Sequence, residues 1–290
     1  MTHLPAVIPS PTQAVWWLGP VAVRAYALCI LAGVGVALWL TVRRWKARGG
    51  EADDVLDVAT WALPLGLVGG RIYHVVTSPE AYFGEGGDPW KAFAIWEGGL
   101  GIWGAVALGA VGAWWACRSQ GWSFAAFADA VVPGLLLAQA LGRFGNWFNN
   151  ELYGGPTDLP WGLRIHQWDH AAGRAVTDAA GDPVVLGTFH PTFLYEAVWC
   201  VLMAALVLWL DRVRTFAAGQ LAGLYLMLYT LGRFFIEMMR TDEANTFFGQ
   251  RINVWVSLAV FLLGLFLYWR AGRKGAPSHR DAEESGARTD

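Results

Sequence analysis

The stretch from Leu141 to Gly155, LGRFGNWFNNELYGG, contains the densest set of chemically capable side chains in the sequence. It follows a long, mostly apolar run, yet it includes an arginine, three asparagines and a glutamate: Arg143, Asn146, Asn149, Asn150 and Glu151. Polar groups at a membrane boundary are costly unless they are paired, so such a group predicts a functional site. The alternative is a re-entrant loop whose polar groups only satisfy one another.

Other ionisable residues also lie inside apolar runs: Arg24, Tyr26, Arg71, Glu97, Asp129, Glu196, Arg233 and Glu237. Arg233 and Glu237 are four residues apart and would share one helix face, either as a neutralising pair or as part of a site. Glu196 is interpreted as an interhelical hydrogen-bond partner. Guanidinium groups bind phosphate in a bidentate manner, so a cluster of arginines predicts a site for an anionic lipid head group. Its expected members are Arg24, Arg71, Arg143 and Arg233.

The composition indicates a polytopic membrane protein. The chain has 290 residues, of which 55% are hydrophobic and only 15% are charged, and its mean hydropathy is +0.36. A net charge of −2 gives no indication of nucleic-acid binding. Three cysteines, Cys29, Cys117 and Cys200, lie in apolar runs without CxxC spacing, so neither a metal site nor a disulfide framework is predicted.

The apolar runs predict an all-α integral membrane protein, a bundle of seven transmembrane helices with an insert on its outer face. The expected helices are Val21–Val42, Val58–Thr77, Ala92–Cys117, Phe124–Gly142, Pro191–Leu210, Gln220–Met239 and Ile252–Trp269. The predicted connection over residues 143–189 contains the polar stretch and then the insert, at about residues 156–189.

The distribution of Lys and Arg predicts the orientation of these helices. Basic residues follow the first, third, fifth and seventh helices, which places the N-terminus outside and the C-terminus in the cytoplasm. Residues 1–20 are then an extracytoplasmic tail, residues 21–269 the transmembrane catalytic domain and residues 270–290 a disordered cytoplasmic tail. The first apolar run lacks a basic region before it and a cleavage site after it, so we expect a retained span.

Several sequence blocks together resemble one family. Residues 142–154 resemble the motif GRxGNxxNxExxG of prolipoprotein diacylglyceryl transferases, and residues 190–196 resemble that family's HPxxLYE block. Further matching blocks are Val23–Tyr26, Gly70–Tyr73, Trp96–Leu100 and Gly232–Glu237 with Arg240. The resemblance extends over residues 21–269, apart from residues 158–188.

The resemblance implies an enzyme of the bacterial inner membrane that takes part in lipoprotein biosynthesis. Such a transferase moves the diacylglyceryl group of phosphatidylglycerol to the thiol of the lipobox cysteine of a prolipoprotein. A thioether forms, glycerol phosphate is released, and no cofactor or metal is needed. The implied partners are phosphatidylglycerol, the lipobox peptide and membrane lipid.

The resemblance also implies roles for single residues. Arg143 and Arg233 would bind the phosphate, with Arg71 as a further head-group contact. Asn146 would hydrogen-bond head-group or glycerol oxygens. Tyr26 would line the head-group pocket, and Gly154 would allow close approach. Glu151 and Glu237 would orient the arginines, or one of them would accept the thiol proton.

One position departs from the pattern of some family members, which have a histidine after the Gly-Gly pair of the third helix. Trp103 stands there in this chain and cannot accept a proton. The base is then another group, with Glu151, Glu237 and His190 as candidates, or no dedicated base is needed.

Two other functions fit part of the sequence. A lipid transporter would use buried arginines along a path and would show polar residues through the full membrane depth. A noncatalytic lipid-binding scaffold would need the arginines but neither Glu151 nor Glu237.

Overall fold

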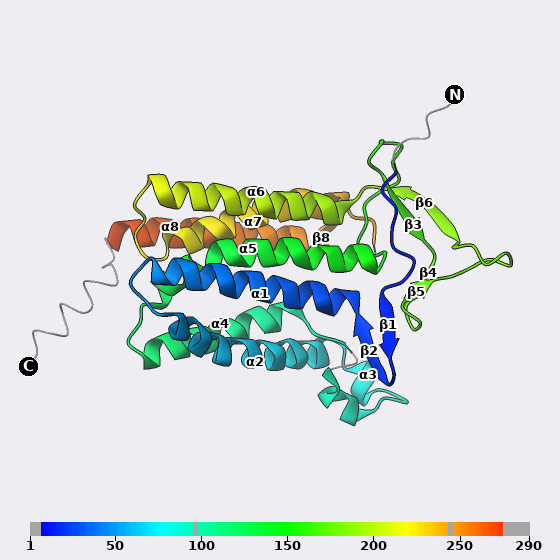
Figure 1. Ribbon diagram of the computed structural model, residues 1–290, viewed down its shortest axis with the longest axis horizontal. Coiled ribbons are helices and arrows are strands. Elements are labelled where there is room, and N and C mark those ends of the chain that lie inside the picture. The colour runs from blue at the N-terminus through cyan, green and yellow to red at the C-terminus, as the bar shows by residue number, and fades with distance from the viewer. Residues whose placement is uncertain (1–6, 96–97, 243–245, 275–290) are drawn as a thin grey trace, which may run out of the picture. The chain divides into compact units, whose positions relative to one another are not determined.

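The computed structural model describes residues 7–95, 98–242 and 246–274, and the chain divides into two compact units. The first unit consists of Met1–Thr41 and Val131–Ala276, and the second contains Val42–Ala130. Each unit is described by itself. Figure 1 shows the order of the helices and strands along the chain.

Long helices form most of both units. They are α1 (Ala25–Lys46), α2 (Ala52–Thr77), α4 (Ile102–Ser119), α5 (Phe124–Phe148), α6 (Thr192–Val213), α7 (Gln220–Met239) and α8 (Ile252–Lys274). Within the described residues, six of them are long and apolar enough to cross a membrane, namely α1, α2, α5, α6, α7 and α8. The chain is therefore a mostly helical, multi-pass membrane protein. The predicted third span corresponds to α4, which is not among the six.

The core of the first unit lies where α5, α6 and α7 meet. Its buried residues include Leu136 on α5, Cys200 on α6 and Leu221 on α7. Helices α7 and α8 approach closely through two glycines, because a Cβ atom added at Gly223 would lie 2.8 Å from the carbonyl oxygen of Gly264. Small residues at such crossings let membrane helices pack backbone against backbone.

The predicted first helix was wrong at its start. Residues Val21–Arg24 form strand β2, which pairs in an antiparallel hairpin with β1 (Val15–Leu18). A turn at Gly19, where φ is +61°, reverses the chain, and β-branched valines favour the extended strand. Arg24 therefore ends a strand, and the helix begins only at Ala25.

The predicted third helix also began too early. Pro89–Phe93 form the short 3₁₀ helix η1 after the one-turn helix α3 (Glu80–Phe83), and α4 begins at Ile102. Gly98 and Gly99 have φ values of +95° and +72°, which an α-helix does not permit. The prediction for Glu97 falls outside the described residues.

The fourth and seventh helices are longer than predicted. Helix α5 continues to Phe148, so Arg143 and Asn146 lie on a helix and not in a connecting segment. Phe144 and Trp147 continue its apolar face and pack against Phe193 of α6, with ring centroids 5.8 and 6.0 Å apart. Helix α8 extends to Lys274, so the tail predicted as disordered from residue 270 is helical at its start.

The insert between α5 and α6 contains strands β3 (Leu163–His166), β4 (Trp168–Asp169), β5 (Arg174–Ala175) and β6 (Val185–Phe189). Strand β3 pairs with β6, and β4 pairs with β5. The N-terminal segment attaches to the insert, because Ile8 bridges to Leu163 and the Ser10 hydroxyl donates to the Arg164 carbonyl. A short hairpin precedes α8 and consists of two strands of two residues each, β7 (Thr246–Phe247) and β8 (Gln250–Arg251).

Candidate active site

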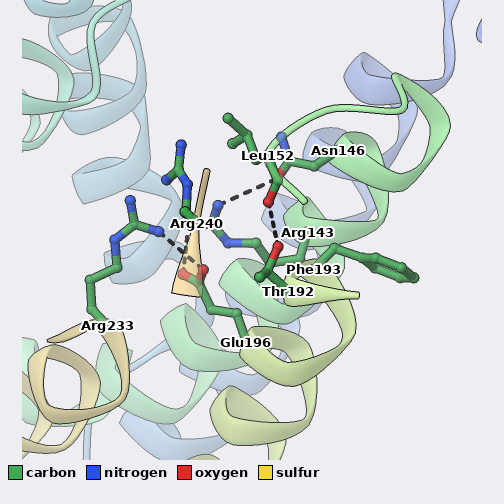
Figure 2. Close-up of a pocket in the computed structure, with 8 residues that line it drawn as sticks. All are labelled: Arg143, Asn146, Leu152, Thr192, Phe193, Glu196, Arg233 and Arg240. Atoms are coloured by element: carbon green, nitrogen blue, oxygen red, sulfur yellow. Dashed lines mark hydrogen bonds and ion pairs between the residues drawn. The ribbon is translucent and has the colours of Figure 1, made fainter. Parts of the chain in front are cut away.

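A buried glutamate on α6 connects two arginines from neighbouring helices. Glu196 is 3% exposed. One carboxylate oxygen lies 2.7 Å from Nη2 of Arg143 on α5, and the other lies 3.1 Å from Nη1 of Arg233 on α7. The Tyr229 hydroxyl also donates to Glu196 at 3.3 Å. The carboxylate thus fixes two guanidinium groups on opposite sides of one pocket (Figure 2).

A second glutamate continues this chain of ion pairs. Glu237 is fully buried, and its Oε2 atom lies 2.8 Å from Arg233 and 3.1 Å from Arg240. Its Oε1 atom accepts hydrogen bonds from Arg251 at 2.7 Å and from Asn253 at 3.1 Å. The predicted pair of Arg233 and Glu237 is confirmed. Because four donors occupy its two oxygens, Glu237 holds arginines in place and has little capacity left to take up a proton.

An aspartate just beyond α7 closes the network. Both Asp242 oxygens accept from Arg240, at 2.8 and 2.7 Å, and Arg251 adds a contact at 3.0 Å. Burial opposes the charge of this carboxylate, but the hydrogen bonds and charges of Arg240 and Arg251 outweigh it. They hold the pKa of Asp242 below its usual range.

The end of α5 brings an amide and a further carboxylate to the same region. Asn146 is 4% exposed; its Oδ1 accepts from Arg143 at 3.3 Å, and its Nδ2 donates to Oε1 of Glu151 at 2.9 Å. Asn149 donates to the same oxygen at 3.2 Å. No ion pair is recorded for Glu151 among the described residues, in contrast to Glu196 and Glu237. Its hydrogen-bond donors are neutral amides.

A strained turn after α5 orients this segment. Asn150 and Leu152 have φ values of +51° and +57°, in the left-handed region that favours glycine. The Asn150 side chain is buried, donates to the Pro11 carbonyl at 2.8 Å and accepts from the His166 amide at 3.1 Å. The Thr192 hydroxyl donates to the Leu152 carbonyl. The insert and the N-terminal segment therefore hold the turn that carries Glu151.

Tyr26, on the first turn of α1, packs directly on the α5 backbone. A Cβ atom added at Gly145 would lie 2.4 Å from its ring, so only glycine leaves room for the tyrosine. Tyr26 therefore lies against the turn of α5 that carries Arg143 and Asn146. Tyr26 is not among the residues that line the pocket between α5, α6 and α7, so its role in lining a head-group pocket stays a prediction.

Gly154 lies where three segments of backbone meet. It forms a bridge with Arg240, and its amide donates to the His190 carbonyl at 3.0 Å. A Cβ atom there would lie 2.8 Å from Cβ of His190 and 3.0 Å from the Met239 carbonyl. Gly154 therefore allows close approach of protein segments.

His190 belongs to a short chain of hydrogen bonds. The indole of Trp161 donates to the Tyr195 hydroxyl at 3.0 Å, and that hydroxyl lies 3.1 Å from Nδ1 of His190. Which of these two groups donates depends on the imidazole tautomer, so the contact is compatible with a free acceptor nitrogen on His190.

The second unit contains Arg71, whose guanidinium binds backbone. It donates to the carbonyls of Ala92 at 2.8 Å, Gly98 at 2.6 Å and Gly99 at 3.0 Å, and also to that of Lys91. Arg71 is 7% exposed and does not snorkel towards solvent. Four of its five N–H groups are thus used to order the segment before α4.

Side chains of the first unit line one small pocket at the shared end of α5, α6 and α7 (Figure 2). The lining residues are Arg143, Asn146, Leu152, Thr192, Phe193, Glu196, Arg233 and Arg240. The space left between these side chains is far smaller than the roughly 300–1,000 Å³ of sites that enclose whole small molecules. Three arginines that converge on one point suit the oxygens of a phosphate group.

The comparisons with known proteins agree on one family. The family model described as prolipoprotein diacylglyceryl transferase matches residues 13–270. The phosphatidylglycerol–prolipoprotein diacylglyceryl transferase of Paenarthrobacter aurescens is 55% identical over 277 residues, which cover 95% of this chain and 87% of the relative. A second such protein from Streptomyces coelicolor is 55% identical over 257 residues, covering 89% and 78%. One from Rhodococcus jostii is 52% identical over 273 residues, covering 93% and 76%.

The chain belongs to the prolipoprotein diacylglyceryl transferase family. It is therefore an enzyme of the transferase class, and the transporter and scaffold alternatives are set aside. The resemblance drawn from the sequence is confirmed over nearly the same residues, 13–270 against the predicted 21–269.

The structure of this transferase brings together most of the residues that the sequence singled out. Arg143, Asn146, Glu151, Arg233 and Glu237 form one connected network, as described above. Arg71 lies in the other unit, and Arg24 is an exposed strand residue. Trp103 lies in the first turn of α4 and is 44% exposed.

Sequence reasoning missed the central position of Glu196 and gave no role to Arg240, Arg251 or Asn253. Glu196 was predicted only as an interhelical partner, which is confirmed, but it binds both expected phosphate ligands. The sequence feature that could have indicated this central position is the place of Glu196 in the HPxxLYE block. Arg251 ends β8 and Asn253 is the second residue of α8, and the sequence around them gave no sign of their contact with Glu237.

Proposed function

We propose that this chain transfers the diacylglyceryl group of phosphatidylglycerol to the lipobox cysteine of prolipoproteins. The curated relatives carry this reaction in their names, and they align with nearly the whole chain. The single observation that supports the site is Glu196, which holds Arg143 and Arg233 beside one small pocket.

In the proposed reaction the peptide thiol first loses its proton, because the thiolate is the nucleophile. The sulfur then attacks the glycerol carbon that bears the phosphate ester. A carbon–sulfur bond forms, the carbon–oxygen bond to phosphate breaks, and glycerol phosphate leaves with the electron pair. The leaving group gains one negative charge, which arginines fixed in a nearly dry site stabilise without reorganisation.

Arg143 and Arg233 are the proposed phosphate ligands. Each uses part of its guanidinium on Glu196, which leaves other N–H groups for phosphate oxygens. Asn146 holds Arg143 and stands beside the pocket, where its amide suits a glycerol oxygen. Tyr26 is proposed to line the head-group pocket next to Arg143. Arg240 lines the same pocket and is a further candidate ligand.

Glu151 is the proposed base. Its partners are two neutral amides, whereas Glu237 accepts from three arginines and an asparagine, which favour its ionised form. The His190 ring is hydrogen-bonded to Tyr195, whereas Glu151 is hydrogen-bonded to Asn146, which lines the pocket. Trp103 has no acceptor at all.

For the topology we propose seven spans of the bacterial inner membrane, namely the six long apolar helices and α4 in addition. The N-terminus would lie outside this membrane. Helix α4 has 18 residues, which at about 1.5 Å per residue span roughly 27 Å. That length nearly matches a hydrocarbon core of about 30 Å. The basic residues after alternate spans support the orientation. The site and the insert at residues 156–189 would then face the outside, where the insert can contact the incoming peptide.

The test is transfer of labelled diacylglyceryl from phosphatidylglycerol to a lipobox peptide by the purified full chain. Wild type would be compared with Arg143→Ala, Arg143→Lys and an exposed control, Glu80→Gln. We expect Arg143→Ala to abolish transfer, Arg143→Lys to retain a small part because lysine is a single point charge, and the control to remain active. No transfer by folded wild type with a reduced peptide would refute the proposal.

A further inference from the structure

The hairpin of β7 and β8 presents two aromatic side chains that nothing in the proposed reaction uses. Phe247 is 58% exposed and Phe248 is 82% exposed. Their ring centroids lie 4.5 Å apart at an interplanar angle of 77°, so they form one edge-to-face pair. No charged residue occurs from Thr246 to Gln250. The tip of the hairpin is therefore a small, wholly uncharged aromatic surface.

The conformation of this tip is defined by a tight turn and by a hydrogen bond from α8. Phe248 and Gly249 have φ values of +49° and +74°, and two such residues in succession make the tight turn that matches the twist of a hairpin. The left-handed region is unfavourable for phenylalanine, so the fold holds Phe248 there. The indole of Trp255 donates to the Phe247 carbonyl at 2.8 Å and fixes the hairpin against the first turn of α8.

The base of the hairpin is attached to the candidate active site. Arg251, the last residue of β8, binds Glu237 at 2.7 Å and the Asp242 carbonyl at 2.6 Å. A two-stranded hairpin is marginally stable in water on its own, so these contacts hold the tip in a defined place beside the ion-pair network.

The tip stands at the membrane end of a span. Helix α8 has 23 residues, about 35 Å at 1.5 Å per residue, which exceeds a hydrocarbon core of about 30 Å. Its first turn therefore reaches the head-group layer. Phe248 is four residues before Ile252, and an extended chain of four residues reaches at most about 14 Å. Ile252 and Trp255, at the start of α8, are further exposed apolar side chains, and Trp255 is hydrogen-bonded to the Phe247 carbonyl.

We propose that the β7–β8 hairpin is a lipid-contacting element whose Phe247–Phe248 tip inserts into the bilayer beside the active site. The occupant of this surface is the glycerophospholipid bilayer, because Trp255 joins the tip to the exposed apolar start of a helix long and apolar enough to cross a membrane, and the tip has no charge to recognise a polar partner. By its position next to Glu237, the element holds the network at the depth of the lipid head groups.

Spin-label accessibility in liposomes of phosphatidylglycerol and phosphatidylethanolamine tests this placement without any activity measurement. The label is attached to Phe248→Cys in a Cys29→Ser background, because Cys117 and Cys200 are fully buried and Cys29 is the half-buried cysteine. Leu262→Cys, in the middle of α8, is the matched lipid reference, and Ala180→Cys, in an exposed turn of the insert, is the matched water reference. Relaxation by oxygen reports lipid, and relaxation by a water-soluble nickel chelate reports water.

We expect the label at position 248 to give an oxygen-to-nickel ratio at least fivefold above that at position 180 and below that at position 262, because the tip lies at a shallower depth than the middle of α8. A ratio equal to that at position 180 would overturn the proposal. A label at position 248 that is exposed to water in liposomes and becomes shielded only when lipobox peptide is added would also overturn the proposal. That result would show that the tip contacts the peptide and not the bilayer.

Discussion

Glu196→Gln tests the central idea that one buried carboxylate positions both phosphate ligands. The substitution keeps the size of the side chain but removes its charge. A glutamine oxygen can still accept from one guanidinium, while its amide nitrogen faces the other, so one of the contacts at 2.7 and 3.1 Å is lost. Removing one partner from a buried ion pair costs about 3–5 kcal/mol. Because the arginine side chains retain 21% and 17% exposure, we expect about 3 kcal/mol of destabilisation.

The effect on catalysis follows from displacement of the arginines. A misplacement of about 1 Å costs on the order of 100-fold in rate, equivalent to about 2.7 kcal/mol of activation free energy. Both guanidinium groups keep their charge and still attract a phosphodiester. We therefore expect kcat to fall about 100-fold while KM for phosphatidylglycerol changes by less than about threefold.

The assay is diacylglyceryl transfer at varied phosphatidylglycerol in mixed micelles, with thermal inactivation measured on the same preparations. Glu80→Gln, an exposed glutamate of α3, is the control for loss of one carboxylate. A kcat within twofold of wild type, or a loss that appears wholly in KM, would show that Glu196 does not position the arginines.

Three further predictions use the same assay. Gly145→Ala forces a Cβ atom to within 2.4 Å of the Tyr26 ring and should lower kcat/KM more than about tenfold, whereas Gly142→Ala, with its nearest neighbour at 3.4 Å, should stay active. Equal losses of kcat/KM in the two glycine variants would contradict this prediction. Glu151→Gln should lower kcat about 10²–10⁴-fold at pH 7, and the loss should shrink as the pH approaches about 8.5, where the thiol ionises unaided. A loss that does not change with pH would exclude Glu151 as the base. The lowered pKa of Asp242 means that its stabilising contribution is present above its unfolded value of about 3.9 and is lost as the pH falls through the folded value. Asp242→Asn should therefore inactivate faster than wild type at pH 7, and the difference in inactivation rate should shrink as the pH is lowered below about 3.9. A difference that does not change with pH would contradict this prediction.

Apolar length and local spacing were sufficient for part of the fold. Helix α7 has the predicted bounds, and the contact between Arg233 and Glu237 follows from a spacing of four residues on that helix. Both depend only on neighbours along the chain. The start of α1 was wrong because the strand Val21–Arg24 depends on pairing with Val15–Leu18, and a hydrophobic run alone does not distinguish strand from helix.

Contacts between distant segments could not be read from the sequence. Arg143 and Glu196 are 53 positions apart, and only the packing of α5 on α6 brings them to 2.7 Å. Arg71 shows the opposite case. An arginine inside an apolar run suggested a phosphate ligand, yet its guanidinium binds backbone carbonyls that glycines at positive φ turn towards it. Residue type alone does not tell whether an arginine binds a ligand or orders a loop.

The charge balance of the network suggests why carboxylates accompany the arginines at all. The ion pairs join four arginines, at 143, 233, 240 and 251, to three carboxylates, at 196, 237 and 242, and Glu151, which is hydrogen-bonded through Asn146, is the fourth carboxylate, so four positive charges face four negative ones. Four unpaired arginines would be costly in a buried site. When Glu151 accepts the thiol proton it becomes neutral, and the site gains one positive charge. The departing glycerol phosphate gains one negative charge in the same reaction. Proton uptake and leaving-group departure therefore compensate each other within the site, which is why we expect loss of Glu151 to lower kcat more than KM.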